Sequence, residues 1–399
     1  MQEEKFPYID RLDETVLDEA ILRFGTPTYV FDVEQAKKRA RAFRGIIGQA
    51  ADLCYAMKAN PFLVRAMAEE VNRIEVCSMG EFRICKQKEI PAEKLLISGV
   101  MKDRDDLWEI LETYGNRCHY TIESLNQYAI LNEWARSSGK KVSVYLRLTS
   151  GNQFGMDEET LTNIVELEQD KDLLEICGIH YFSGTQKKRK KTLEELTYLD
   201  EVFARLKEKT GYQVTELEYG PGLAVPYFAR QADERFETLE AIADALAKMQ
   251  WQGKVTLEMG RAFVADCGYY ITTVKDTKRS GDQNYCIIDG GMHQVNYDGQ
   301  IRGMYQPKLT IRPQGARGIY QNWTICGELC TGNDILVQNI KIDDLRVGST
   351  IIFENTGAYA VTEGMALFLS HVLPAVVLYD PVGGFTQVRA RRETYVWNS

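Results

Sequence analysis

One lysine and two glycine-containing segments carry the residue types best suited to chemistry in this sequence. Lys58 follows the apolar segment 52–57 and offers a primary amine at its end. Residues 220–222 read Gly-Pro-Gly, and glycine lets backbone N–H groups approach a phosphate closely. Residues 258–261 read Glu-Met-Gly-Arg, which brings a carboxylate, a glycine and a guanidinium together. This combination suits an anionic ligand with a cationic ring.

Alternating strands and helices are predicted to position these residues. From about residue 34 to residue 258, β-rich apolar segments alternate with amphipathic helices, which is typical of parallel strands with helical crossovers. The strand candidates are residues 52–59, 73–78, 95–99, 119–122, 142–148, 174–182, 214–219 and 255–258. Eight such strands predict a TIM-type (β/α)8 barrel, an α/β fold whose strands carry the chemistry at their C-terminal ends. Lys58, Phe182 and Glu258 fall at such ends.

After residue 268 the helical rhythm stops and a second, mostly β domain is predicted. Its strand candidates are residues 269–274, 285–289, 309–312, 334–337 and 349–354. Residues 26–33 also read as a strand, which we expect to join that sheet. The predicted domains are therefore 34–265 for the barrel, and 1–33 with 266–399 for the β domain.

Composition favours a small-molecule ligand. Forty-eight Lys and Arg against 57 Asp and Glu give a net charge of −9, which disfavours nucleic acid and anionic membrane. The longest apolar stretch, 364–379, is interrupted by Ser370, His371 and Pro374, so no membrane segment is expected. Nine scattered cysteines favour a reduced, cytoplasmic protein. Four histidines without ligand spacing support no metal site and argue against a metal-dependent barrel hydrolase.

Six short segments, taken in order, resemble the fold-type III amino-acid decarboxylases, the diaminopimelate and ornithine decarboxylase family. The resemblance spans about residues 26–380 and implies pyridoxal 5′-phosphate as the cofactor. It also implies a homodimer with shared active sites. The segments are Tyr55 to Asn60, Gly184 to Gln186, Gly220 to Leu223, Glu258 to Arg261, Cys330 with Asp334, and Gly357 to Tyr359.

The resemblance implies a role for each matched residue. Lys58 is the Schiff-base lysine, and Glu258 keeps the pyridine nitrogen protonated, so that the ring accepts the electrons left by carbon dioxide. Cys330 protonates Cα from the partner subunit, and Phe182 replaces a ring-stacking histidine. The other residues that the resemblance places at the cofactor are Thr185, Gly220, Gly222, Gly260, Arg261 and Tyr359.

The sequence departs from the family at the positions that bind the distal group of the substrate. Thr331 stands where an acidic residue normally follows the cysteine and binds a distal ammonium group. The arginine-proline element for a distal carboxylate is not recognisable, and Arg302 is a candidate substitute. His180 lies one pleat repeat behind Phe182, where it either supports the site or belongs to the barrel core. We therefore expect altered specificity.

Other interpretations of the sequence and of its function stay open. The basic run 186–191 is interpreted as a solvated loop, or as a surface that receives an acidic substrate or a carrier protein. With Thr331, that run suits decarboxylation of an aminoacyl group on a carrier protein. An alanine-racemase-like enzyme would use an arginine at the ring nitrogen, which Glu258 disfavours. A small cofactor-binding protein of the same barrel would lack the β domain.

Overall fold

The computed structural model describes residues 11–171, 173–315 and 317–399, which fold into two compact units. The first comprises residues 40–224 and 234–262, and the second comprises the described part of 1–39 with 225–233 and 263–399. Residues 225–233 were assigned to the barrel from sequence but group with the β unit. Asn355 Nδ2 donates to Pro226 O at 3.1 Å, and Ala229 N donates to Gln306 O at 2.9 Å, which fastens this loop there.

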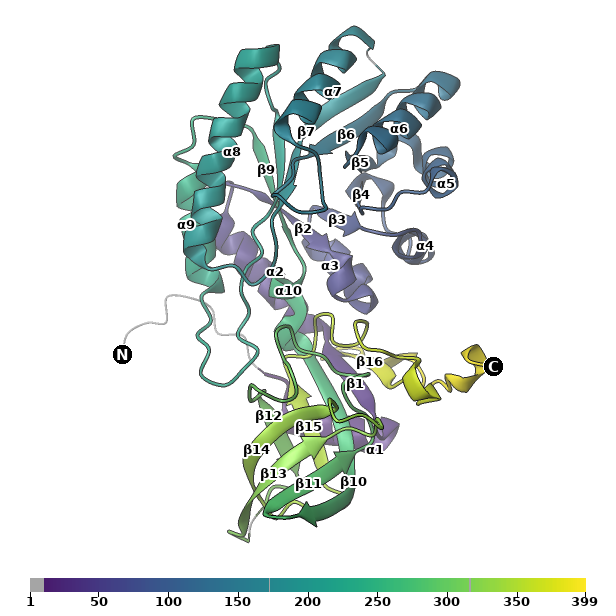
Figure 1. Ribbon diagram of the computed structural model, residues 1–399, viewed down its shortest axis with the longest axis vertical. Coiled ribbons are helices and arrows are strands. Elements are labelled where there is room, and N and C mark those ends of the chain that lie inside the picture. Colours follow the sequence, from purple (N-terminus) through teal and green to yellow (C-terminus); the bar gives the residue numbers. More distant parts are fainter. Residues whose placement is uncertain (1–10, 172, 316) are drawn as a thin grey trace. The chain divides into compact units, whose positions relative to one another are not determined.

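The first unit is a closed barrel of eight parallel strands, as predicted (Figure 1). Each strand pairs in parallel with the next, and β9 closes the barrel on β2. The strands are β2 Asp52–Ala56, β3 Arg73–Val76, β4 Leu95–Ile97, β5 His119–Ile122, β6 Val142–Arg147, β7 Leu174–Phe182, β8 Glu216–Gly220 and β9 Lys254–Met259. The C-terminal ends of β7, β8 and β9 therefore lie side by side.

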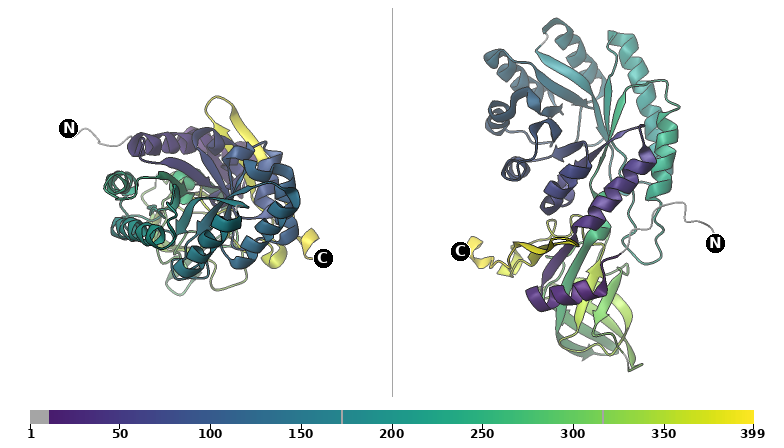
Figure 2. Two further views of the ribbon diagram at one scale, coloured as in Figure 1. Left: turned by 90° about the horizontal axis from the view of Figure 1, so that it is seen from above. Right: turned by 180° about the vertical axis from the view of Figure 1, so that it is seen from behind.

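Helices surround these strands, as the view from above in Figure 2 shows. They are α3 Val64–Glu70, α4 Met79–Gln87, α5 Arg104–Tyr114, α6 Leu125–Ser138, α7 Glu158–Lys171, α8 Arg189–Thr210 and α9 Arg235–Leu246. In α8 the buried residues Leu196, Leu199, Phe203 and Leu206 recur at helical spacing and form one apolar face. No described helix combines the length and apolar character needed to cross a bilayer.

The second unit is a nine-stranded sheet in which β1 Thr28–Asp32 pairs antiparallel with β10 and parallel with β16. Its other strands are β10 Gly268–Ser280, β11 Gln283–Ile288, β12 Leu309–Arg312, β13 Tyr320–Cys326, β14 Ile335–Asp343, β15 Thr350–Glu354, β16 Ala375–Asp380 and β17 Gly384–Arg389. Helix α1 Glu14–Phe24 buries Leu17 and Ala20 against β1, β10 and β15. Helix α2 Val33–Ile47 leads into the barrel.

Three strands of this sheet were missed from sequence. The first half of β13 is polar and exposed, and β17 is an exposed edge strand, so neither has a simple apolar alternation. Strand β16 begins inside the apolar stretch 364–379 and ends one residue beyond it, so it was read as part of that longer run. Strand signals fail where a strand is exposed at an edge or embedded in a longer apolar run.

Candidate functional site

Lys58 lies in a tight turn after β2 rather than in the strand itself. The predicted strand 52–59 ends at Ala56, and the 3₁₀ turn Met57–Ala59 follows. Asn60 explains the early end, because its N–H bonds Met57 O at 3.0 Å and its side chain accepts from Phe62 N. The turn leaves the Lys58 side chain 35% exposed at the C-terminal end of the barrel.

Glu75 and Cys77, which the sequence analysis missed, contact the Lys58 amine. Glu75 Oε2 accepts a hydrogen bond from Lys58 Nζ at 2.7 Å, and Cys77 Sγ lies 3.4 Å from the same nitrogen. Cys77 donates to the other oxygen of Glu75 at 3.0 Å. Burial and the nearby Glu75 raise the pKa of the Cys77 thiol well above its usual value, so it remains a donor. The signal that could have identified Glu75 from sequence is a carboxylate that stands between Ile74 and Val76 in a buried strand.

His180 and Glu258 form a buried pair across the barrel. Nε2 of His180 in β7 lies 3.0 Å from Oε2 of Glu258 in β9, and both side chains are almost fully buried. Burial, with a smaller contribution from Arg147, lowers the pKa of His180 to about 3, so the ring is neutral at physiological pH. The structure thus brings His180 to Glu258, one of the two placements considered from sequence.

Glu258 has no cationic partner among the described residues. Its one hydrogen bond is to the neutral His180, and no described lysine or arginine forms an ion pair with it. A buried carboxylate is costly unless a cation or several donors meet it. A ligand that brings a positively charged N–H to Glu258 would supply that partner.

The predicted glycines lie where strand ends approach one another closely. A Cβ on Gly222 would lie 2.1 Å from Gly184 O, and a Cβ on Gly220 would lie 2.5 Å from the Phe182 ring. A Cβ on Gly260 would lie 2.8 Å from the Ala59 side chain, in the turn that carries Lys58. The glycines therefore let the ends of β7, β8 and β9 meet beside that turn.

Arg261 and Thr185 lie beside the glycine-rich edge, which is formed by Gly220, Gly222 and Gly260. Arg261 Nε donates to Thr185 Oγ1 at 3.2 Å, which connects the end of β9 to the segment after β7. Gly222 O accepts from Lys187 N at 2.8 Å, and Gly222 has a positive φ of 59° that favours glycine. Backbone N–H groups and a guanidinium gathered at one edge suit a phosphate.

These residues fit pyridoxal phosphate. The buried Glu258 suits a protonated pyridine nitrogen, the glycines with Arg261 suit the phosphate, and the Lys58 amine suits the aldehyde. The Phe182 ring, packed at Gly220, offers an aromatic face. Each part of the cofactor has a chemically matched group within the barrel unit.

The other predicted residues belong to the β unit. Cys330 is exposed in a loop between β13 and β14, and Asp334 holds this loop by accepting from Met292 N at 2.7 Å and Leu329 N at 2.9 Å. Thr331 Oγ1 accepts from Asn333 N at 3.4 Å within the same loop. Arg302 and Tyr359 both have positive φ, and Arg302 is exposed. The loop exposes the Cys330 thiol, and Asp334 anchors the loop through its two hydrogen bonds.

The basic run 186–191 is only partly the solvated loop that the sequence suggested, because Lys187 turns inward. The Lys187 side chain is 8% exposed and bonds Glu195 at 2.5 Å and Ser183 Oγ at 3.0 Å. Helix α8 begins at Arg189, which pairs with Glu234 at 3.6 Å. Lys187 therefore braces the loop between β7 and α8, while Lys188, Lys190 and Lys191 stay exposed.

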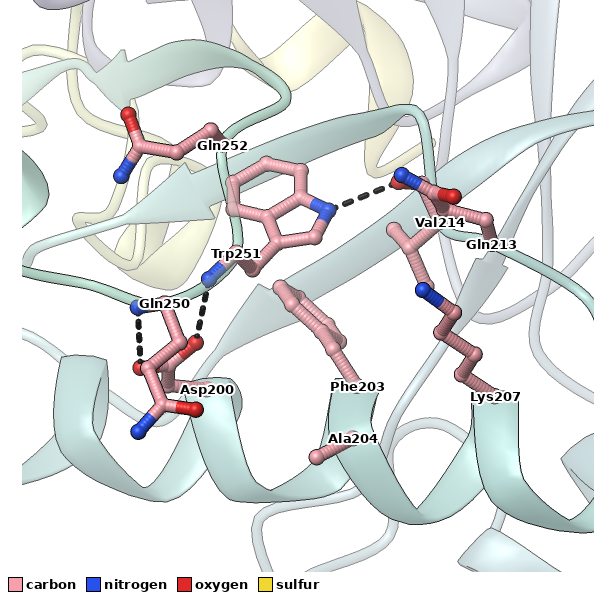
Figure 3. Close-up of a pocket in the computed structure, with 9 residues that line it drawn as sticks. All are labelled: Asp200, Phe203, Ala204, Lys207, Gln213, Val214, Gln250, Trp251 and Gln252. Atoms are coloured by element: carbon pink, nitrogen blue, oxygen red, sulfur yellow. Dashed lines mark hydrogen bonds between the residues drawn. The ribbon is translucent and has the colours of Figure 1, made fainter.

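A separate cavity of about 310 Å³ lies outside this site (Figure 3). Phe203 and Trp251 form its apolar part, and the Trp251 indole N–H donates to Val214 O at 2.7 Å. Val214 and Gln252 precede β8 and β9, so the cavity lies at the opposite end of these strands from Gly220 and Gly260. None of the predicted site residues lines it.

Comparison with known proteins gives a family match over the barrel. The family model of the pyridoxal-dependent decarboxylases, pyridoxal binding domain, matches residues 33–265. The chain is 26% identical over 394 residues to an L-glutamyl-(BtrI acyl-carrier protein) decarboxylase of Niallia circulans, covering 92% of each chain. It is 27% identical over 382 residues to a diaminopimelate decarboxylase of Aquifex aeolicus, covering 88% of each.

The fold is also that of a solved structure. The diaminopimelate decarboxylase of M. jannaschii, in complex with L-lysine, superposes with a TM-score of 0.85 at 23% sequence identity. The match covers 94% of this chain and 92% of the other, so it includes both the barrel and the β unit. At this identity the superposition establishes the architecture.

Proposed function

Since the chain belongs to the pyridoxal-dependent decarboxylases, we propose that Lys58, Glu258 and Cys330 carry its reaction. That reaction is the pyridoxal phosphate-dependent decarboxylation of an amino acid. The observation that carries the proposal is the buried Glu258, whose described hydrogen-bond partner is a neutral histidine. The relatives named above are decarboxylases, which gives the racemase alternative no support.

Lys58 and Glu75 prepare the amine that holds the cofactor. A lysine amine must lose its proton before it can act as a nucleophile. Glu75 Oε2, at 2.7 Å from Nζ, is placed to accept that proton and to orient the amine. Lys58 is thus the residue that would hold the cofactor and give it up to the substrate amine.

Glu258 and the glycine-rich edge hold the two ends of the cofactor. Pyridoxal phosphate, when bound, supplies a cationic ring that takes up the electron pair released as carbon dioxide leaves. Glu258 would keep the proton on the ring nitrogen, and Phe182 would offer its aromatic face to the ring. The proposed phosphate ligands are Thr185, Gly220, Gly222, Gly260, Arg261 and, from the β unit, Tyr359.

Cys330 is the proposed proton donor to Cα, acting from the partner subunit of a homodimer. Its exposure in a single chain suits a thiol that serves a second subunit. Asp334 fixes the loop by accepting two backbone hydrogen bonds, so the thiol is carried by an anchored loop. The thiol gives its proton to Cα and takes another from solvent.

The proposed substrate lacks a free distal ammonium group. Thr331, where the family carries an acid, offers a hydroxyl that is bonded within its own loop. A buried ammonium without its acidic partner loses roughly 3–5 kcal/mol. An uncharged or carrier-bound distal group avoids that cost.

An aminoacyl group on a carrier protein is the second candidate, supported by one relative. The Niallia circulans enzyme acts on an L-glutamyl group carried by an acyl-carrier protein. The exposed Lys188, Lys190 and Lys191 could meet an acidic carrier, although Lys187 is committed to Glu195.

Carbon dioxide release separates these candidates. The purified, cofactor-loaded enzyme is given meso-diaminopimelate, lysine, ornithine, arginine, glutamate, neutral and aromatic amino acids, and aminoacyl carrier proteins. We expect turnover of uncharged or carrier-bound substrates and little turnover of the diamines. Efficient turnover of diaminopimelate or lysine would contradict the proposed specificity, and no turnover of any substrate would contradict the decarboxylase assignment.

Restoring the missing acid should shift specificity toward diamines. Thr331→Glu is expected to raise kcat/KM for lysine or ornithine by about tenfold or more, because the new carboxylate pairs with the distal ammonium. Thr331→Gln, of the same size and without charge, is the matched control and should not produce this gain. Equal effects of the two variants would show that position 331 does not read the distal group.

A further inference from the structure

The His180 imidazole is positioned to give one hydrogen to Glu258. It is 1% exposed, it lies two residues before the C-terminal end of β7, and its Nε2 is 3.0 Å from Glu258 Oε2. Its Nδ1 is buried and has no hydrogen-bond partner among the described residues. The ring therefore has one polar contact, and that contact is to the glutamate proposed to meet the cofactor nitrogen.

The single contact decides which nitrogen carries the hydrogen. A neutral imidazole has one donor and one acceptor nitrogen. With the hydrogen on Nδ1, a buried donor would be left unpaired, and Nε2 would set a lone pair against a carboxylate oxygen. With the hydrogen on Nε2, the carboxylate accepts it and only an acceptor is left unpaired, which costs less. The Nε2–H form is the favoured one.

Charged groups around the ring are already paired with one another. Arg147 bonds Glu123 at 2.8 Å, Lys58 bonds Glu75 at 2.7 Å, and Arg73 bonds Glu218 at 2.5 Å. These pairs come from β3, β6, β8 and the segments after β2 and β5. The pairs of Arg147 and Lys58 act on His180 electrostatically, and Glu218 lies opposite it in the sheet. None of the described cations is left to meet Glu258, so the imidazole is its protein partner.

Strand pairing prevents the ring from moving away. His180 O accepts from Leu148 N at 3.0 Å, and His180 lies opposite Arg147 in β6 and Glu218 in β8. Glu258 is held in the same way, opposite Cys54 of β2. Both backbones are thus fixed by the barrel, and the hydrogen bond fixes the remaining side-chain torsions of the glutamate.

We propose that His180 is a positioning residue, which donates Nε2–H to one oxygen of Glu258 and leaves the other oxygen aimed at the protonated ring nitrogen of the cofactor. No described residue forms a hydrogen bond with that second oxygen. A neutral donor orients the carboxylate without cancelling its charge, whereas a lysine or arginine in its place would compete with the ring. This inference rests on the proposed role of Glu258.

The test compares two substitutions of His180 with one elsewhere in the barrel. His180→Leu removes the donor and keeps most of the volume, while the side-chain amide of His180→Gln reaches as far as Nε2 and keeps a donor. His119→Leu is the matched control, because His119 is a histidine of strand β5 whose buried Nδ1 is also unpartnered and which does not contact Glu258. Folding of each variant is followed by thermal melting.

The readouts are cofactor affinity, the cofactor absorption spectrum, and kcat and KM separately. His180→Leu is expected to weaken pyridoxal phosphate binding by about tenfold to a hundredfold and to shift the spectrum towards the unprotonated ring. It should lower kcat far more than it raises KM. His180→Gln should stay within about threefold of the wild type, and His119→Leu should leave the spectrum unchanged.

A double-mutant cycle with Glu258→Gln separates failure of this inference from failure of the proposed function. If His180 acts through Glu258, adding His180→Leu to Glu258→Gln should weaken cofactor binding no further. Additive losses, or a wild-type spectrum in folded His180→Leu, would overturn the positioning role while Glu258 keeps its own. If His180→Leu does not fold, equal loss in His180→Gln and His180→Asn would overturn it instead, because Asn is too short to reach Glu258. A wild-type spectrum in Glu258→Gln would contradict the proposed function itself.

Discussion

Replacing Lys58 with alanine is expected to lower the decarboxylation rate by at least about a thousandfold, because the reaction loses the amine that holds the cofactor and exchanges it with the substrate. The fold should survive. Lys58 lies in a turn with a side chain 35% exposed, and its loss leaves Glu75 still bonded to Cys77. Rates are measured under saturating cofactor, so that weaker binding is not mistaken for lost chemistry.

Lys102 is the alternative candidate for the lysine that binds the cofactor. It is a buried lysine of the same barrel unit, and burial lowers its pKa to about 8, which is a common property of reactive lysines. Its Nζ donates to Gly99 O at 2.7 Å, Gln127 Oε1 at 3.0 Å and Thr121 Oγ1 at 3.1 Å. All three of its hydrogens are therefore used in holding the loop after β4.

Peptide mapping decides between the two lysines. Borohydride fixes the cofactor to the lysine that carries it, and the labelled peptide of the wild type should contain Lys58. The label should be absent from Lys58→Ala and unchanged in Lys190→Ala, an exposed lysine that serves as control. A label on Lys102, or normal turnover by Lys58→Ala, would overturn the assignment.

The sequence predicted the barrel well because its signals are local. Three of the strands at the site carry a recognisable residue at or just after their C-terminal end, namely Lys58, Gly220 and Glu258. Strand β7 was predicted with its observed bounds, Leu174–Phe182. Local patterns suffice where every repeat has the same period and both faces of the strand are buried.

Contacts across the barrel could not be predicted in this way. Glu75 meets Lys58 from a different strand, and no spacing in the sequence relates the two. Lys187 appeared to be one of several surface lysines, yet its side chain is buried against Glu195, nearly two turns into α8. The choice between His180 as core residue and as partner of the site also needed the measured approach to Glu258.

Glu258→Gln is expected to lower kcat by about 10²–10³-fold, which is the scale for losing one fixed charge partner of the reacting group. Glutamine keeps the size of the side chain but removes its charge. Its amide then turns N–H groups toward the ring nitrogen, which favours an unprotonated ring. The ring loses the positive charge that draws electrons from the substrate, so turnover should fall more than cofactor binding.

Two other substitutions make the Glu258 prediction specific to charge at that position. Glu258→Asp keeps a carboxylate and should retain much more activity than the glutamine variant. Glu218→Gln removes a neighbouring buried carboxylate that bonds Arg73 at 2.5 Å. It should lower the melting temperature, because Arg73 is then left with the more distant carboxylate of Glu216, at 3.8 Å. It should leave the cofactor spectrum unchanged. If Glu258→Gln kept a wild-type spectrum and a kcat within about threefold, the ring would not depend on this carboxylate for its proton, and the electron sink would have to be maintained by another group.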